Sequence, residues 1–270
     1  METSSIEKKE VWEYLSSEIG YMALLRNLKG MEDAGISRDI KSKIASRISD
    51  KDEVARSRQL PFRFLSAYRE LGRYGYNYFL TALEDALEHS LVNVPALDGK
   101  TLIVIDNSGS MYYSGGYGSM TYADTANLFG VALAKRANDA TVVVYGTRSN
   151  ELNFRSTSST FHIVKNIEAM GGTDTAGTIK KHYNESYTRV IVLTDEQYGY
   201  SYGRVRGNPY AVVNKSTPVF TWNLAGYESG NKAESNRYTL GGLTDASFRT
   251  IPLVEASKDE QWPWEVDNKS

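Results

Sequence analysis

Two short apolar runs, each ending in a carboxylate, constrain the fold of the second half of the chain. Residues 102–105 are followed by Asp106, and residues 190–193 are followed by Thr194-Asp195. Runs of this length, separated by segments with helical spacing, are typical of buried strands. Strands that alternate with helices predict an α/β domain with a mostly parallel sheet flanked by helices.

The same alternation continues along the rest of this half. Because parallel sheets bind ligands beyond the carboxyl ends of their strands, the two terminal acids indicate a site there. We expect strands at residues 101–106, 141–145, 189–195 and 218–223, and helices at residues 122–138, 161–170, 210–214 and 244–255.

The first half has helical spacing throughout. Apolar side chains follow a period near 3.6 residues, which indicates amphipathic helices. One helix is expected over residues 11–29, and others over 62–74 and 78–91. Between the first two, an apolar stripe recurs every four residues, at Ile36, Ile40, Ile44 and Ile48. Helix pairs of this length predict a partial α-helical repeat segment.

Composition excludes several classes of protein. The chain of 270 residues has no cysteine and only three dispersed histidines, which excludes a disulfide scaffold and disfavours a zinc site. No window is long and apolar enough for a membrane span, and five glutamates in the first 20 residues leave no signal-peptide core. We divide the chain into a helical segment (1–97), an α/β domain (98–257) and a tail (258–270).

A set of hydroxyl and acidic residues follows the expected strands. Asp106-Asn107-Ser108-Gly109-Ser110 ends the first strand, Thr173 lies in the loop at residues 171–175, and Asp195 ends a later strand. These side chains offer hard oxygen ligands, which suit Mg²⁺ or Mn²⁺ better than zinc or copper. The alternative is that Thr173 and Asp195 only cap helices.

This ordered set resembles the metal-ion-dependent adhesion site (MIDAS) of von Willebrand factor A domains, over residues 100–255. The resemblance implies a Rossmann-like sheet. It also implies that the two serines and the threonine coordinate Mg²⁺ or Mn²⁺, while the acids bind it directly or through water. The implied metal residues are Asp106, Ser108, Ser110, Thr173 and Asp195.

The helical half is similar to the Ro autoantigen (TROVE) family. Residues 20–28 read GYMALLRNL, close to its M-x-L-L-R-N-L signature, and Pro61-Phe62 matches a later helix start. In that family a helical-repeat module precedes a von Willebrand A domain, and further repeats close a ring around an RNA-binding hole. The chain begins almost at the signature, so we expect it to be a truncated relative, a cut fragment or half of a split ring protein.

The family resemblance implies binding of non-coding RNA in a ribonucleoprotein, and two sequence features bear on that expectation. Residues 20–75 carry 12 Lys+Arg and 7 Asp+Glu, a net charge of +5 that can meet phosphates. Two tyrosine-rich loops, at residues 112–122 and 197–206, follow the metal-site strands and can stack on bases or bind protein. Candidate RNA contacts are Lys41, Lys43, Arg47, Tyr113, Tyr117, Tyr200, Tyr202, Arg204 and Arg206.

The sequence therefore predicts a cytoplasmic Ro-like RNA-binding protein with a divalent-metal site and no membrane association. One alternative is a protein-interaction module whose metal accepts a partner's carboxylate. Another is half of a split ring protein. Nucleophile elbows and phosphate-cradling loops are absent from the sequence, so we expect no enzyme activity.

Overall fold

The computed structural model describes residues 5–73, 78–113, 115, 120–195, 208–225 and 236–258. The chain separates into two compact units. The helical unit comprises residues 1–93 with 159–161, and the α/β unit comprises residues 94–158 with 162–270. In the part of the chain that the structure describes, no helix has the length and apolar character needed to cross a membrane.

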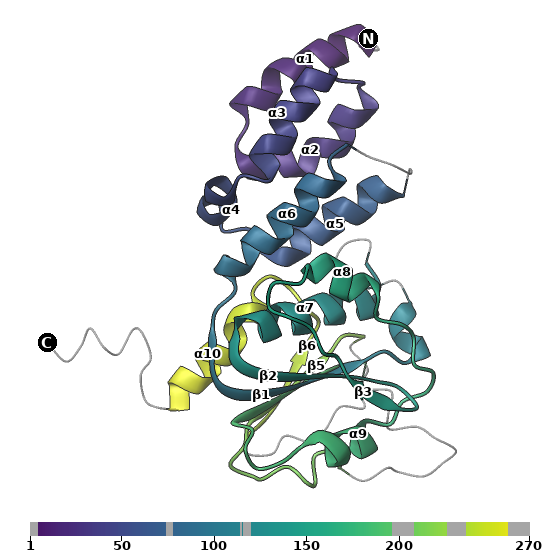
Figure 1. Ribbon diagram of the computed structural model, residues 1–270, viewed down its shortest axis with the longest axis vertical. Coiled ribbons are helices and arrows are strands. Elements are labelled where there is room, and N and C mark those ends of the chain that lie inside the picture. Colours follow the sequence, from purple (N-terminus) through teal and green to yellow (C-terminus); the bar gives the residue numbers. More distant parts are fainter. Residues whose placement is uncertain are drawn as a thin grey trace, which may run out of the picture. The chain divides into compact units, whose positions relative to one another are not determined.

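The helical unit is built from six α-helices within its described residues (Figure 1). The single helix expected over residues 11–29 is wrong, because the chain breaks at Gly20, whose backbone is extended (φ −67°, ψ 161°). Glycine has a low helix propensity, so a break there costs little. The helices are α1 (Ser5–Glu18), α2 (Tyr21–Asp33), α3 (Arg38–Ile48), α4 (Lys51–Ser57), α5 (Pro61–Gly72) and α6 (Leu80–Ser90).

The core of this unit confirms the helical periodicity. Ile44 and Ile48 of the four-residue stripe are buried, whereas Ile40 is only half-buried. The Tyr21 hydroxyl donates to the Ile48 carbonyl (2.7 Å), which ties the start of α2 to the end of α3. These contacts close a small apolar core whose other fully buried side chains include Leu24, Leu28, Met31, Phe62 and Phe64.

Arg47 links three parts of the helical unit. Its guanidinium donates to the carbonyls of Ser16 (2.9 Å) and Ile19 (3.4 Å), close to the break between α1 and α2. It also contacts both carboxylate oxygens of Glu53 on α4 (3.2 Å each). The planar fork of arginine suits such multiple acceptors. Arg47 therefore satisfies carbonyls that the end of α1 leaves without a helical partner.

Replacing Arg47 by methionine is expected to lower the free energy of unfolding by about 1–3 kcal/mol, because partly buried acceptors lose a charged donor. Replacing Lys43 by methionine is the control, since Lys43 is exposed on the same helix and its loss is expected to change stability by less than about 0.5 kcal/mol. Urea denaturation of both variants measures the difference. Equal midpoints for the two variants would contradict the role given to Arg47.

The α/β unit contains a mixed, six-stranded sheet. It is mostly parallel, as the sequence predicted. The strand order is β3-β2-β1-β4-β5-β6, and only β3 is antiparallel to its neighbour. The strands are β1 (Leu97–Asp106), β2 (Ala137–Tyr145), β3 (Ser149–Glu151), β4 (Arg189–Thr194), β5 (Val219–Asn223) and β6 (Arg237–Gly241).

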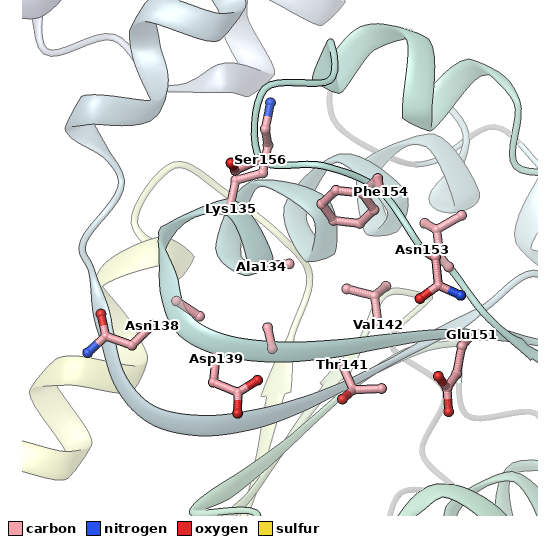
Figure 2. Close-up of a pocket in the computed structure, with 13 residues that line it drawn as sticks. Ala134, Lys135, Asn138, Asp139, Thr141, Val142, Glu151, Asn153, Phe154 and Ser156 are labelled. Atoms are coloured by element: carbon pink, nitrogen blue, oxygen red, sulfur yellow. The ribbon is translucent and has the colours of Figure 1, made fainter.

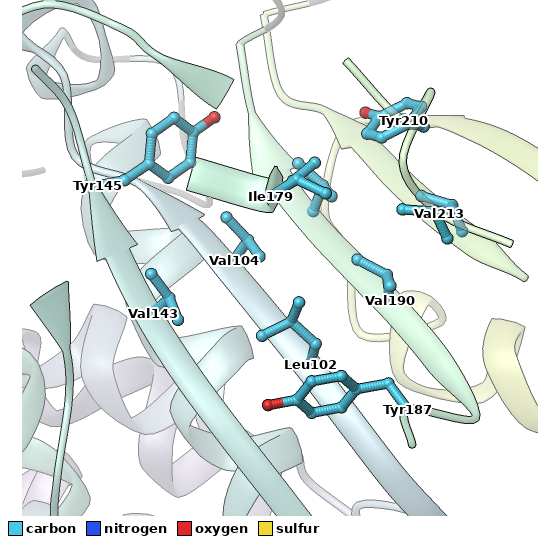
Figure 3. Packing of buried hydrophobic residues seen from close by; sticks show 11 residues of the cluster. Leu102, Val104, Val143, Tyr145, Ile179, Tyr187, Val190, Tyr210 and Val213 are labelled. Atoms are coloured by element: carbon cyan, nitrogen blue, oxygen red, sulfur yellow. The ribbon is translucent and has the colours of Figure 1, made fainter. Parts of the chain in front are cut away.

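Helices cover both faces of this sheet (Figure 1). On one face, Phe129 of α7 packs against Phe248 of α10 (ring centroids 4.6 Å apart). On the other face, Ile179 of α9 packs in a cluster with β1, β2 and β4 side chains, among them Leu102 and Val104 (Figure 3). The α-helices described in this unit are α7 (Tyr122–Arg136), α9 (Thr175–His182), α10 (Ser247–Lys258) and the part of α8 (Thr160–Lys165) that follows Phe161.

Some expected elements differ from those observed. Residues 210–214 form turns rather than a helix, and the helix expected over residues 161–170 ends at Lys165. Tyr210 and Val213 are buried in the apolar cluster, so tertiary packing rather than helical periodicity explains their spacing. The two short outer strands, β3 and β6, were not predicted, because an edge strand of few residues leaves little alternation to detect.

Candidate metal centre and nucleic-acid interface

Asp106 is the last residue of β1, and its side chain is fully buried. One carboxylate oxygen accepts the Ser108 backbone N–H (2.8 Å). The other accepts the hydroxyls of Thr194 (2.8 Å) and Tyr145 (3.3 Å). Burial raises the pKa of Asp106 to about 6, although the hydrogen bonds from Ser108 and Thr194 oppose that shift. A charge at this position is therefore desolvated, and an adjacent cation would stabilise it.

The two serines of the same loop lie side by side. The hydroxyl oxygens of Ser108 and Ser110 are 3.2 Å apart, although the residues differ in exposure, with Ser108 buried and Ser110 half-buried. A short 3-10 helix, Gly109–Tyr112, holds this spacing immediately after the strand. The loop thus presents two hydroxyls next to a buried carboxylate.

A second loop is held against the first by backbone hydrogen bonds. The Gly109 N–H donates to the Gly171 carbonyl (2.8 Å), and the Met170 N–H donates to the Asn107 carbonyl (2.7 Å). Gly171 has a positive φ of 83°, a conformation that glycine adopts without strain. This pairing places Thr173, which is half-buried, two residues beyond the contact with the serine loop.

Asp195 directly follows β4, the neighbour of β1. The register pairs Ile105 with Leu193, so the ends of the two strands lie together and Asp195 falls just beyond the Thr194–Asp106 hydrogen bond. Asp195 is 1% exposed, and its charge contributes to the raised pKa of Asp106. The sheet therefore brings two buried carboxylates to one edge.

The donor set fits a hard divalent cation. Two carboxylates and neighbouring hydroxyls are oxygen ligands of the kind that Mg²⁺ and Mn²⁺ prefer. Among the described residues, no group of three or more His, Cys, Asp or Glu side chains is placed to hold a metal. A cation here would thus rely on hydroxyls and water as well as on the two acids.

Sequence reasoning missed the residues that support these loops. Asn107 and Asn127 of α7 exchange two amide hydrogen bonds (3.0 Å each), and the Tyr112 hydroxyl donates to Asn107 (3.1 Å). Tyr145 contacts the Thr175 hydroxyl (2.9 Å) as well as Asp106. Asn107 lies inside the segment singled out above, but nothing in the sequence identifies its partner 20 residues later.

The candidate RNA-contacting cations differ in their surroundings. Lys41 forms an ion pair with Glu32 (2.8 Å), and Arg47 is held by Glu53 and two carbonyls. Lys43 is exposed. In the described part of the chain, no ion pair joins an acidic side chain to any of six exposed cations of the helical unit: Arg26, Arg38, Lys43, Lys51, Arg56 and Arg58.

Of the tyrosine loops, only the first part can be described. Tyr113 is 70% exposed and follows the short helix that carries Ser110. Tyr117, Tyr200, Tyr202, Arg204 and Arg206 lie outside the described residues. The geometry therefore places one exposed tyrosine next to the candidate metal centre.

Comparisons with known proteins agree with both halves of this architecture. Residues 2–78 match the TROVE domain model. The chain is 38% identical over 68 residues to telomerase protein component 1 of Rattus norvegicus and 37% identical over 68 residues to that of Mus musculus, which is 24% of this chain in each case. It spans only 3% of the length of either relative.

The crystal structure of the Ro (RSR) protein of Deinococcus radiodurans has a similar fold. It superposes with a TM-score of 0.72 at 17% sequence identity, over 94% of this chain and 56% of that one. The fold similarity extends beyond the TROVE match into the α/β unit. Residues 2–78 are therefore similar to the TROVE domain, and the chain as a whole shares the fold of a solved Ro protein, in which a helical segment precedes an α/β unit.

Proposed function

We propose that this chain is a non-enzymatic RNA-binding protein and a component of a ribonucleoprotein. The observation that carries the proposal is the set of six exposed cations on the helical unit, none of which is paired with an acid within the described residues. Phosphates supply most of the affinity of non-specific nucleic-acid binding, and unpaired surface cations are the groups that bind them. The match of residues 2–78 to the TROVE domain supports the same proposal.

The sequence around these cations favours an anionic partner. Residues 20–75 have a net charge of +5, whereas the whole chain has a net charge of −2, so positive charge is concentrated in this segment. Such a segment attracts a polyanion even when the protein as a whole is weakly acidic. A cytoplasmic location remains a sequence-based prediction.

Reversing the charge of three of the six exposed cations tests whether they contact RNA. The triple variant Arg38→Glu, Lys43→Glu and Arg56→Glu is expected to weaken binding of a labelled single-stranded RNA for every sequence alike. Since each phosphate contact contributes about 0.7 to the slope of log K against log salt, the slope is expected to become shallower by about 2. Fluorescence anisotropy at several salt concentrations measures both quantities.

A matched control applies the same charge change to the α/β unit. Arg148, Arg155 and Lys180 are exposed there, and their replacement by glutamate also changes the net charge by −6 relative to the parent. We expect this variant to bind RNA with nearly the parental salt slope. If the two triple variants behave identically, binding follows net charge alone and the helical surface has no special role.

We also propose that Asp106, Ser108, Ser110, Thr173 and Asp195 hold Mg²⁺ or Mn²⁺. The support is the convergence of two buried carboxylates and two adjacent hydroxyls at one sheet edge. A bound cation there would supply a positive anchor for an anionic ligand. The chain's own residues orient that anchor: Thr194 and the Ser108 N–H fix the Asp106 carboxylate, and the Asn107–Asn127 pair fixes the loop.

A second function is favoured by the exposure of the loops at this edge. The loops around the two buried acids are exposed at Gly109, Gly171 and Gly172. A cation held by the acids would therefore face solvent and could accept a carboxylate of a partner protein. In this second function, binding of the partner protein requires Mg²⁺ and does not involve RNA. Mg²⁺-dependent binding of an acidic peptide that Asp106→Asn abolishes, in a chain that fails to bind RNA, would favour it.

A further inference from the structure

The edge of the sheet is open along the first half of β2. β1 pairs with β2 on one side, whereas β3 covers only Val143–Tyr145 on the other. After a last backbone hydrogen bond from Leu152 to the Val142 carbonyl (2.8 Å), the chain leaves β2 and reaches α7, where Lys135 donates to the Ser158 carbonyl (2.6 Å). Within the described residues, residues 137–141 therefore have a strand neighbour on one side only.

The direction of the β2 backbone groups follows from the bonds to β3. The Val142 carbonyl and the Gly146 N–H both bond on the β3 side. Because successive residues of a strand direct their backbone groups to opposite sides, Asn138 and Ala140 also direct theirs toward the open edge. A row of outward N–H and carbonyl groups is a template for another strand.

A groove accompanies this edge. A cavity of about 340 Å³ lies between β2 and residues 151–156. Figure 2 shows the Phe154 ring and Val142 facing this gap near Ala134 of α7, while the carboxyl groups of Asp139 and Glu151 lie on the opposite side of β2. The groove thus has the Phe154 ring and Ala134 on the α7 face of the sheet, within a lining that is mostly polar, and an acidic rim on the other face.

The rim carries a net negative charge. Asp139 is exposed and forms no ion pair within the described residues, and the Glu151 side chain is 52% exposed, with the His182 Nδ1 atom 3.4 Å away. Lys135 is the one lysine or arginine among the lining residues, and its ammonium donates to the Ser158 carbonyl. Charge complementarity therefore favours a ligand that carries positive side chains.

We propose that the open edge of β2 binds an extended segment of a partner protein as an added strand, in which apolar residues alternate with Lys or Arg. The period of two in a strand sends alternate side chains to opposite faces. One set would then contact Phe154 and Ala134 in the groove, and the other would lie beside Asp139 and Glu151. Main-chain hydrogen bonds supply the affinity and these side chains supply the selectivity.

Binding of a labelled peptide, Val-Lys-Val-Lys-Val-Lys, to the full chain tests this proposal by fluorescence anisotropy. We expect saturable binding, and no binding of the same peptide with glutamate in place of lysine. The variant Asp139→Lys/Glu151→Lys is expected to bind at least about tenfold more weakly, because the two acids that attract the peptide's lysines are replaced by cations that repel them. The control Glu168→Lys/Glu185→Lys makes the same charge change at exposed positions elsewhere and is expected to stay within about twofold of the parent.

A backbone variant separates strand addition from simple charge attraction. Ala140→Pro removes an outward N–H and leaves the side of β2 that pairs with β1 intact, so we expect weaker peptide binding with cooperative thermal unfolding retained. Should this variant fail to fold, the charge variants decide the question. Absent binding to the parent chain, or equal loss in both double variants, would overturn the proposal. So would a dimer that Asp139→Lys/Glu151→Lys converts to a monomer, since a second copy would then occupy the edge.

Discussion

Replacing Asp106 by asparagine is expected to abolish Mg²⁺ and Mn²⁺ binding and to make the metal-free protein more stable. The substitution removes a charged ligand but keeps an oxygen for the Ser108 N–H, and the hydroxyls of Thr194 and Tyr145 can turn to accept from the new amide. Burial raises the pKa of Asp106 from 3.8 to about 6. At pH 7 the ionised group therefore costs on the order of 3 kcal/mol relative to the unfolded chain.

The sign of this effect defines a pH window. The folded state binds the Asp106 proton more tightly than the unfolded state does. The metal-free parent is therefore expected to lose stability as the pH rises from about 4 to about 6, and ionisation of Asp106 causes no further loss above that range. The asparagine variant lacks this dependence. Thermal unfolding in chelator across pH 4–8 measures it, and calorimetric titration measures metal affinity.

A control variant isolates the ligand role. Asp174→Asn makes the same substitution in the neighbouring loop, where the exposed Asp174 side chain caps α9 by accepting the Gly177 N–H (3.0 Å). Asparagine caps helices about as well as aspartate, so both stability and metal affinity are expected to stay near the parental values. Unchanged metal affinity in Asp106→Asn would show that the cation, if bound, lies elsewhere.

Replacing Gly146 by alanine is expected to lower the free energy of unfolding by about 2–3 kcal/mol and to weaken metal binding. A Cβ atom on Gly146 would clash with the Met170 carbonyl oxygen and lie 2.6 Å from the carbonyl carbon. Since these are backbone atoms, the loop at residues 170–173 must move away. That movement strains the Met170–Asn107 and Gly109–Gly171 hydrogen bonds, which hold the two loops of the candidate metal centre together.

Gly241→Ala serves as the matched control. A Cβ atom there meets nothing within 4 Å, and Gly241 has no positive φ, so we expect a change of less than about 0.5 kcal/mol. Urea denaturation and calorimetric metal titration of both variants measure the two effects. If Gly146→Ala unfolds at the same urea concentration as the control, the close approach of the two loops is not as described.

The sequence predicted the fold where burial on both faces determines the pattern. The apolar runs of β1 and β4 are buried along the segments that the sequence indicated, because a parallel central strand has no polar face. The break at Gly20 and the turns at residues 210–214 were missed, because apolar side chains there pack against distant parts of the chain rather than along one helix. Local periodicity carries no information about such packing.

The candidate metal centre shows a similar limit. Acids at strand ends were predicted to converge, and β1 and β4 do place Asp106 and Asp195 at one edge, because neighbouring parallel strands end together.

The sequence did not show which of the candidate RNA-contacting side chains are paired with acids and which are exposed. Lys41, Lys43 and Arg47 look alike in sequence, yet two are held by acids and only Lys43 is exposed, because their partners come from α2 and α4.

Titration of a labelled single-stranded RNA with the parent chain tests the central proposal most directly. At ~50 mM salt we expect saturable binding. As salt increases, log K is expected to fall linearly against log salt with a slope of about −2 or steeper, because three or more phosphate contacts are made. The measurement needs no variant and no assumption about the metal. Absence of binding at that low salt, or affinity that salt does not change, would contradict RNA binding through the exposed cations of the helical unit.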